Sequence, residues 1–257
     1  MPKPPILTPF RHAIYDLPLS LWLSFCVLGV FFTSQIGGIL LATSVVLSHA
    51  ITNPANVPNA QSNFDFLLRM GSQNGLAISL SVLFTGVVVL GFIALLIKFK
   101  KGATLQDYLA LHGFTGKQFL GFTAILLLLN GFIELVSNWL GLTPMSFMDD
   151  IFPTAKPLWL LVLAMVIIAP IYEEVMFRGF MWAGLAKPLG FWWASIATSL
   201  VFAWIHGQYT PIEGVAIVAL AMVFSWARAK SNSLGLPIVL HIMNNGLAMG
   251  LYLAGIK

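Results

Sequence analysis

Long apolar runs with few or no charged residues constrain the fold of this chain more than any other feature. A helix needs roughly 20 apolar residues to cross the hydrocarbon of a bilayer, and there it must satisfy its own backbone hydrogen bonds. The runs therefore predict membrane-spanning helices. There are seven of them, near Leu19–His49, Leu76–Ile97, Phe119–Leu142, Leu158–Tyr172, Phe191–Ile205, Gly214–Ala227 and Leu234–Ile256.

The composition agrees with this pattern. Of the 257 residues, 58% are apolar and only 9% are charged, whereas an average soluble domain is roughly 45–50% apolar and about 25% charged. This excludes a soluble enzyme, a disordered tail and a nucleic-acid-binding module. We expect an all-α, polytopic membrane helix bundle of about seven transmembrane spans, with the lipid bilayer as a partner. The one cysteine, Cys26, lies inside an apolar run, so no disulfide framework or cysteine-based metal site is expected.

The positive charges predict how the spans are oriented. Short cytoplasmic loops of membrane proteins carry an excess of lysine and arginine. One predicted side holds Lys3, Arg11, Lys98, Lys100, Lys101, Lys117, Arg178, Lys187, Arg228 and Lys230, and the other holds only Arg69, Lys156 and Lys257. We therefore expect a cytoplasmic N-terminus in an integral membrane protein, and we expect the membrane to be the inner membrane of a bacterial cell.

The fourth, fifth and sixth runs are short, at about 14–15 apolar residues each, below the roughly 17 that crossing hydrocarbon requires. Polar residues must extend these runs, and such residues face protein or water. An ionisable group inside a membrane costs roughly 2.5–3.5 kcal/mol on insertion scales, which makes it a functional-site candidate. The ionisable residues in or beside the runs are Glu134, Glu173, Glu174 and Arg178.

The strongest cluster is Glu173-Glu174-Val175-Met176-Phe177-Arg178. On a helix, Glu174 and Arg178 are four residues apart with the acid first, which is the favourable orientation for an ion pair. Glu173 is rotated by about 100° from Glu174. We expect one carboxylate to be structural and one reactive, with Pro170 kinking the chain just upstream. The alternative is a pair of interfacial carboxylates at a helix end, tied to the arginine.

Two further motifs carry groups suited to hydrolysis. His206 closes the fifth run, and a neutral imidazole can take a proton from water. His241 and Asn245 share one helical face, where their N–H groups could donate to an oxyanion. Taken singly, His206 is better explained as a hydrogen-bonded core histidine, and the other pair as polar contacts between helices. Together with Glu173 they form a set suited to water attack on a carbonyl.

The depth of these residues depends on how the fifth span is placed. Glu173 and His206 flank a turn near Pro188–Gly190 at almost equal distance, so antiparallel helices would bring them to one depth. In a simple seven-span arrangement, however, His241 lies about 10 Å from the cytoplasmic end of its span, whereas His206 lies near the far end of its own. A hairpin at Pro188 that protrudes into the cytoplasm, with a turn at Gly207–Pro211 inside the protein, would remove this conflict.

The three motifs, Glu173-Glu174-x-x-x-Arg178, Phe202-x-x-x-His206 and His241-x-x-x-Asn245, resemble those of the CPBP family in order and approximate spacing. That family includes type II CAAX prenyl proteases, bacteriocin-processing enzymes and Abi proteins. The resemblance covers about Leu158 to Ile256. It implies an all-α intramembrane glutamate protease without a metal or other cofactor. Its substrate would be a membrane-associated or prenylated peptide or protein.

The resemblance also implies a role for each residue of the site. Glu173 and His206 would activate water. His241 and Asn245 would stabilise the tetrahedral oxyanion. Glu174 and Arg178 would orient and balance the site.

The chain divides, on this basis, into two parts of a single integral membrane domain. Residues 1–117 would form N-terminal membrane spans and a cytoplasmic surface segment, and residues 118–257 a CPBP-like catalytic core. In the surface segment, Thr104–His112, we expect Leu105, Tyr108 and Leu109 to share one helical face. Glu134, one turn after Asn130, is expected to be an interhelical hydrogen-bonding group.

Two other functions fit the same residues. A non-enzymatic immunity or scaffold protein of the membrane could retain the motifs for structure. A zinc-dependent membrane hydrolase could use Glu173, His206 and His241 as a His₂Glu ligand set, although no HExxH motif is present. A transporter would need paired broken helices or internal repeats, and the sequence shows neither.

Overall fold

The computed structural model describes residues 14–51, 68, 71–142 and 146–255. Across these residues all regular structure is helical, which confirms the all-α prediction. The α-helices are α1 (Leu17–Ile51), α3 (Gly75–Phe99), α4 (Leu105–Leu109), α5 (Gly116–Trp139), α6 (Met148–Ile151), α7 (Leu158–Val162), α8 (Ala169–Glu174), α9 (Trp182–Trp204), α10 (Pro211–Ser231) and α11 (Gly235–Leu253). A 3-10 turn, η3 (Phe152–Thr154), follows α6, and two π-helical segments, η4 (Leu163–Ile168) and η5 (Val175–Met181), flank α8.

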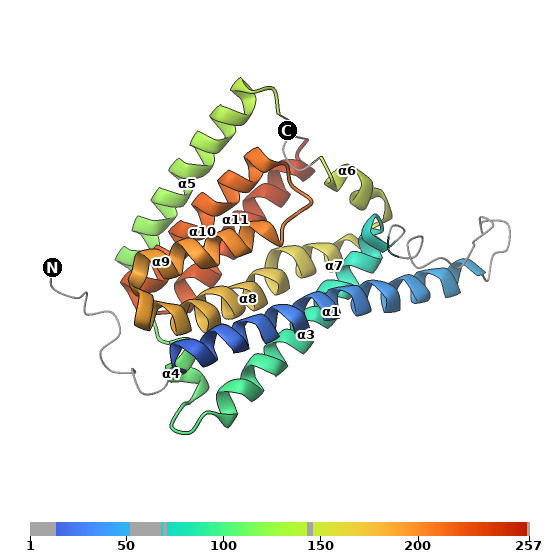
Figure 1. Ribbon diagram of the computed structural model, residues 1–257. Coiled ribbons are helices and arrows are strands. Elements are labelled where there is room, and N and C mark those ends of the chain that lie inside the picture. The colour runs from blue at the N-terminus through green and yellow to red at the C-terminus, as the bar shows by residue number, and fades with distance from the viewer. Residues whose placement is uncertain (1–13, 52–67, 69–70, 143–145, 256–257) are drawn as a thin grey trace.

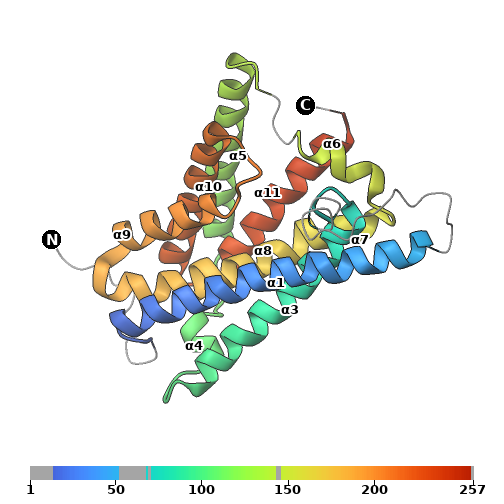
Figure 2. The same cartoon turned by 45° about the vertical axis from the view of Figure 1, so that its right-hand side comes forward.

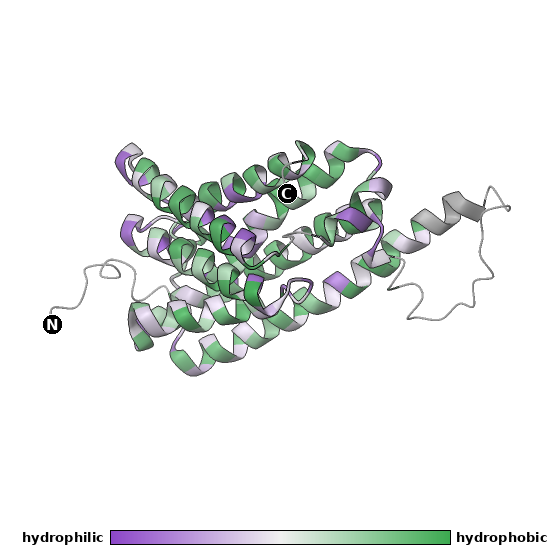
Figure 3. Cartoon of the chain, turned by 90° about the horizontal axis from the view of Figure 1, so that it is seen from above, coloured by the Kyte–Doolittle hydropathy of each residue, from purple (hydrophilic) through white to green (hydrophobic). Residues whose placement is uncertain are grey.

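The apolar runs do become long helices. Six described helices are long and apolar enough to cross a membrane, and the fourth of these stretches extends over Leu158–Trp204. Within that stretch Gly190 has a φ of 80° and a ψ of 175°, which breaks the helix into two arms. Since glycine lacks a Cβ, it adopts this conformation without steric cost. Counting both arms gives the seven predicted runs, and hydrophobic residues cover most of their length (Figure 3).

The first arm of this hairpin is longer than the sequence pattern predicts. The fourth run was expected to end at Tyr172, but the helix continues through α8, η5 and the first half of α9. The polar residues do not stop it because they are buried and paired inside the bundle. Two cations that were assigned to loops, Arg178 and Arg228, are likewise buried within helices.

The first arm of the hairpin lies at the centre of the bundle (Figures 1 and 2). On one side α1 and α3 pack together and against its first arm, and on the other side α10 and α11 pack against it. The outermost helix is α5, which contacts α10 and α11. The first arm is therefore shielded on both sides, and buried polar groups on it must find their partners within the protein.

The segment around α4 forms a short helix whose apolar residues are only partly covered. Of the three residues predicted to share a face, Leu105 is exposed, whereas Tyr108 and Leu109 are buried. Leu109 packs closely on Gly179, where an added Cβ would lie 2.9 Å from Leu109 Cδ2. The helix ends at Ala110, whose φ of 50° is left-handed and whose carbonyl oxygen accepts from the Leu234 N–H. The segment is thus docked against η5, because its apolar face finds a protein surface.

Candidate active site

A buried ion pair forms the centre of the candidate site. Glu174 and Arg178 are both 0% exposed, and Arg178 Nη1 lies 2.9 Å from Glu174 Oε1. Arg178 Nη2 donates to the Ala221 carbonyl oxygen of α10 at 3.0 Å. The predicted i, i+4 ion pair is present. Its burial makes the pair a structural link between the first arm and α10, in contrast to exposed pairs, which contribute little.

His241 of α11 joins this ion pair from across the bundle. Its Nδ1 lies 2.9 Å from Glu174 Oε1, and its Nε2 lies 3.7 Å from Glu173 Oε2. A carboxylate oxygen accepts, so Nδ1 donates to Glu174 and Nε2 is the nitrogen that faces Glu173. Phe224 stacks on the imidazole with ring centroids 4.9 Å apart, which fixes the plane of the ring.

His206 comes close to this cluster through an aromatic neighbour. The Phe202 ring centroid lies 4.5 Å from that of His206 and 5.9 Å from that of His241. His206 Nδ1 lies 2.7 Å from the Phe202 carbonyl oxygen. Because a carbonyl oxygen only accepts, Nδ1 carries the hydrogen, and Nε2 of the neutral ring is the basic nitrogen. Among the described residues no hydrogen bond joins His206 to Glu173.

Asn245 lies one helical turn beyond His241 and pairs with the first arm. Its Nδ2 donates to the Met165 carbonyl oxygen at 3.1 Å. The local sequence explains this bond. The Ala169 N–H donates to Ala164, five residues back, and Pro170 has no N–H to offer to Met165. The π-helical register therefore leaves the Met165 carbonyl without a helix donor, and Asn245 supplies one.

The helix packing also explains how Glu174 and His241 meet although they lie at different distances from the ends of their helices. Glu174 is 16 residues from the break at Gly190, about 24 Å along the helix, whereas His241 is six residues from the start of α11, about 9 Å. Since Glu174 and His241 are in contact, the hairpin turn extends beyond the α10–α11 connection. The expectation that this turn protrudes into the cytoplasm stays a prediction. The depth of the site in a membrane stays a prediction.

The sequence pattern missed the aromatic framework of the site. The Arg178 guanidinium lies 4.7 Å from the ring centroid of Phe202 and 5.5 Å from that of Phe224. Phe202 thus touches both histidines and the arginine. Phe202 could have been found from the sequence, because it is the first residue of the Phe202-x-x-x-His206 motif. Phe224 could not, because it lies in an apolar run and belongs to no motif.

A second polar link reaches Asn245 from α5. Asn130 Nδ2 donates to Asn244 Oδ1 at 3.0 Å, and Asn244 Nδ2 lies 3.5 Å from Asn245 Oδ1. Glu134 was expected to make the interhelical bond, but it accepts from Asn138 of its own helix at 3.0 Å. Asn130 contacts α11, and Glu134 lies one turn farther along; both residues line a groove between α5, α10 and α11.

The described residues contain no group of three His, Cys, Asp or Glu side chains arranged to hold a metal ion. Glu173 and His241 do lie near each other, but His206 Nδ1 is bonded to a backbone carbonyl and its ring packs on Phe202. Glu173, His206 and His241 are therefore not arranged as the His₂Glu ligand set that a zinc hydrolase would need.

The fold and this cluster define an integral membrane protein, all α-helical, with an ionisable site inside its bundle. Residues 155–247 match the family model described as type II CAAX prenyl endopeptidase, Rce1-like. The match confirms the resemblance to the CAAX protease and CPBP family, and the matched segment contains all six candidate residues. Searches of curated proteins and of solved structures found no match. The division at residues 117 and 118 stays a prediction.

Proposed function

We propose that this protein is an intramembrane endopeptidase that cleaves a peptide bond in a membrane-associated or prenylated peptide or protein, using water activated by Glu173 and His206. The observation that carries the proposal is the buried contact set Glu174–Arg178–His241 with Glu173 beside it, on the segment that matches a CAAX endopeptidase family. The family description supports a protease. The residue roles and the substrate are our inference.

The contacts favour Glu173 as the reactive carboxylate. Glu174 Oε1 accepts from both Arg178 and His241, so it is committed to holding the helices together. Among the described residues Glu173 makes no such bond, and the His241 ring lies 3.7 Å from its carboxylate. Its neighbours therefore leave its oxygens available for a water molecule. We therefore assign Glu174 as the structural carboxylate and Glu173 as the reactive one.

The proposed reaction is a metal-independent hydrolysis. Glu173 and the Nε2 atom of His206 take a proton from water as its oxygen bonds to the carbonyl carbon of the substrate. The tetrahedral intermediate then collapses, the C–N bond breaks, and the proton passes to the leaving amine nitrogen. The products are a carboxylate and a protonated amine: both hydrogens of the water end on the amine nitrogen, so atoms and charge balance.

The oxyanion of the intermediate needs nearby donors. Asn245 uses one amide hydrogen on the Met165 carbonyl oxygen and retains a second. His241 donates from Nδ1 to Glu174, so it must be doubly protonated to donate from Nε2 as well. Removing one oxyanion donor typically lowers kcat by about 10²–10³-fold.

The test is cleavage of membrane-tethered and prenylated reporter peptides by the purified full chain in detergent. We expect Glu173→Gln and His206→Asn each to lower kcat by about 10²–10⁴-fold, the usual contribution of a general base. Glu134→Gln is the matched control, because it removes a carboxylate from a span without touching the site. Each protein is assayed with and without a chelator.

Three results would overturn the proposal. Activity lost with chelator and restored by zinc would favour the zinc hydrolase. Full activity in Glu173→Gln would remove that carboxylate from the mechanism. Absence of cleavage of every reporter by well-folded wild-type protein would favour a non-enzymatic immunity or scaffold role.

A further inference from the structure

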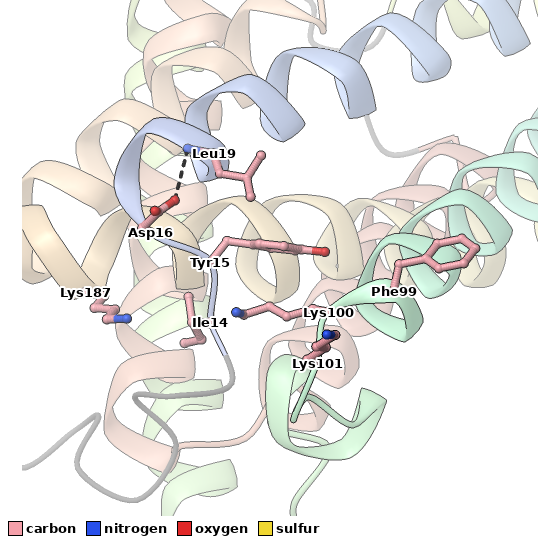
Figure 4. A pocket seen from close by; sticks show the side chains of 8 residues that line it. All are labelled: Ile14, Tyr15, Asp16, Leu19, Phe99, Lys100, Lys101 and Lys187. Carbon is pink, nitrogen blue, oxygen red and sulfur yellow. Dashed lines mark hydrogen bonds between the residues drawn. The ribbon is translucent and has the colours of Figure 1, made fainter.

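A basic cavity opens at one end of the bundle, where α1 begins, α3 ends and the long hairpin turns (Figure 4). Its volume is about 450 Å³, and its charged lining consists of Lys100, Lys101, Lys187 and a single acid, Asp16. Lys187 is 86 residues after Lys101 in the sequence. The fold, rather than a local charge run, therefore gathers the three lysines around one cavity.

Asp16, the one carboxylate that the described residues bring to the cavity, is already engaged. Asp16 Oδ1 accepts from the Leu19 N–H at 3.3 Å and so caps the first turn of α1. Within the described residues, no carboxylate forms an ion pair with Lys100, Lys101 or Lys187. The preceding thirteen residues of the sequence contain no aspartate or glutamate. The cavity therefore keeps a surplus of positive charge that an anionic ligand could balance.

The lysines are positioned rather than freely solvated. Lys100 and Lys187 are half-buried, and Figure 4 shows their amines extending toward each other across the chain at Ile14. Lys100 Nζ lies 4.9 Å from the ring centroid of Tyr15, a cation–π contact. The Tyr15 hydroxyl donates to the Leu96 carbonyl oxygen at 2.5 Å, which fixes the ring. Burial raises the pKa of Tyr15, so the hydroxyl keeps the proton that it donates.

The cavity is continuous with an apolar, outward-facing surface. Leu19 and Phe99 line it and are 44% and 78% exposed. Farther along α1, Trp22 and Phe25 are 71% and 70% exposed. On a membrane-spanning helix, exposed apolar side chains face lipid. A ligand in the cavity can thus place a charged group among the lysines and an apolar tail against α1 and α3.

We propose that this cavity binds the headgroup phosphate of an anionic phospholipid, with the acyl chains lying along α1 and α3. Basic pockets between membrane helices are suited to anionic headgroups because the lysines neutralise the phosphate while the chains stay in hydrocarbon. The exposed apolar rim favours a lipid over free phosphate. The inference is independent of the proposed protease activity, because neither the site nor its test involves Glu173 or His206.

The test measures lipid binding to the delipidated full chain in detergent. Phosphatidylglycerol, phosphatidylcholine with the same acyl chains, and inorganic phosphate are each titrated, and the melting temperature and the lipid retained in native mass spectrometry are recorded. We expect one phosphatidylglycerol to be retained and to raise the melting temperature, because a ligand that binds only the folded state stabilises it. The other two ligands should do neither.

Two triple variants locate the site. Lys100→Gln with Lys101→Gln and Lys187→Gln should weaken phosphatidylglycerol binding at least tenfold, since each lysine near an anionic surface contributes roughly fivefold. The control variant, Lys98→Gln with Lys117→Gln and Lys230→Gln, removes the same charge from exposed positions outside the cavity and should bind like wild type. If the first variant does not fold, Lys187→Gln alone must weaken binding several-fold.

Three outcomes would overturn the inference. Equal retention of phosphatidylcholine would show that the charge plays no part. An equal effect of inorganic phosphate would identify a free anion as the ligand. An equal loss of phosphatidylglycerol binding in the control variant would show that the lipid is held by the general positive charge of the surface and not by a defined site.

Discussion

Replacing Arg178 tests how much the buried ion pair stabilises the bundle. In Arg178→Met, Glu174 loses its cation and the Ala221 carbonyl oxygen loses its donor. A hydrogen bond to a charged group is worth about 1.5–3 kcal/mol, and removing one partner of a buried pair costs about 3–5 kcal/mol. Because Arg178 is 0% exposed and no water reaches Glu174 to replace it, we expect the upper part of that range to apply.

A double-mutant cycle separates the pair from simple loss of packing. Glu174→Gln with Arg178→Met removes both charges, so the double variant should be more stable than the sum of the single losses implies, by at least about 1 kcal/mol. Unfolding in mixed micelles with increasing SDS can be followed by the fluorescence of the eight tryptophans. Lys98→Met, at an exposed position of α3, is the control. A loss below about 1 kcal/mol for Arg178→Met, or strict additivity in the cycle, would refute the reasoning.

Two other substitutions test the surroundings of the site. Asn130→Leu removes the hydrogen bond to Asn244, which in turn approaches Asn245. We expect kcat on the reporter peptide to fall several-fold with KM unchanged. A purely structural role of Asn130 would instead lower the melting temperature and leave kcat unchanged. Ala110→Gly removes the backbone strain of a residue with a left-handed conformation at the end of α4. It should raise the free energy of unfolding by about 0.5–1 kcal/mol in the same SDS titration. A decrease would show that the packing of the alanine methyl group contributes more than this strain costs.

Much of the fold was predictable because it depends on local sequence. The apolar runs gave the long helices, and Gly190 breaks the central stretch close to the turn expected at Pro188–Gly190. The main error in the helix bounds was the end of the fourth run. Hydropathy predicts where a chain is apolar, but Glu173, Glu174 and Arg178 are kept in a helix by partners elsewhere, so the polar stretch did not mark a helix end.

The docking of α4 could not be predicted for the same reason. Leu105, Tyr108 and Leu109 look like the apolar face of a surface helix in a local pattern. Whether such a face meets lipid headgroups or protein depends on which surface is adjacent, and here η5 presents Gly179 to Leu109. Glu134 is a similar case, because it pairs with Asn138 of its own helix, whereas Asn130, one turn earlier, makes the hydrogen bond to α11.

The sequence by itself determined the class of protein and the residues of the candidate site. Transfer of apolar side chains into a bilayer and the i, i+4 geometry of a helix are local properties, so the spans and the Glu174–Arg178 pair could be inferred from neighbouring residues. Only the tertiary structure showed that Glu174 contacts His241, because that residue reaches it from 67 residues away in the sequence. The same holds for the lysines around the basic cavity. Contacts of this kind depend on how the helices pack, and that packing is a property of the whole chain.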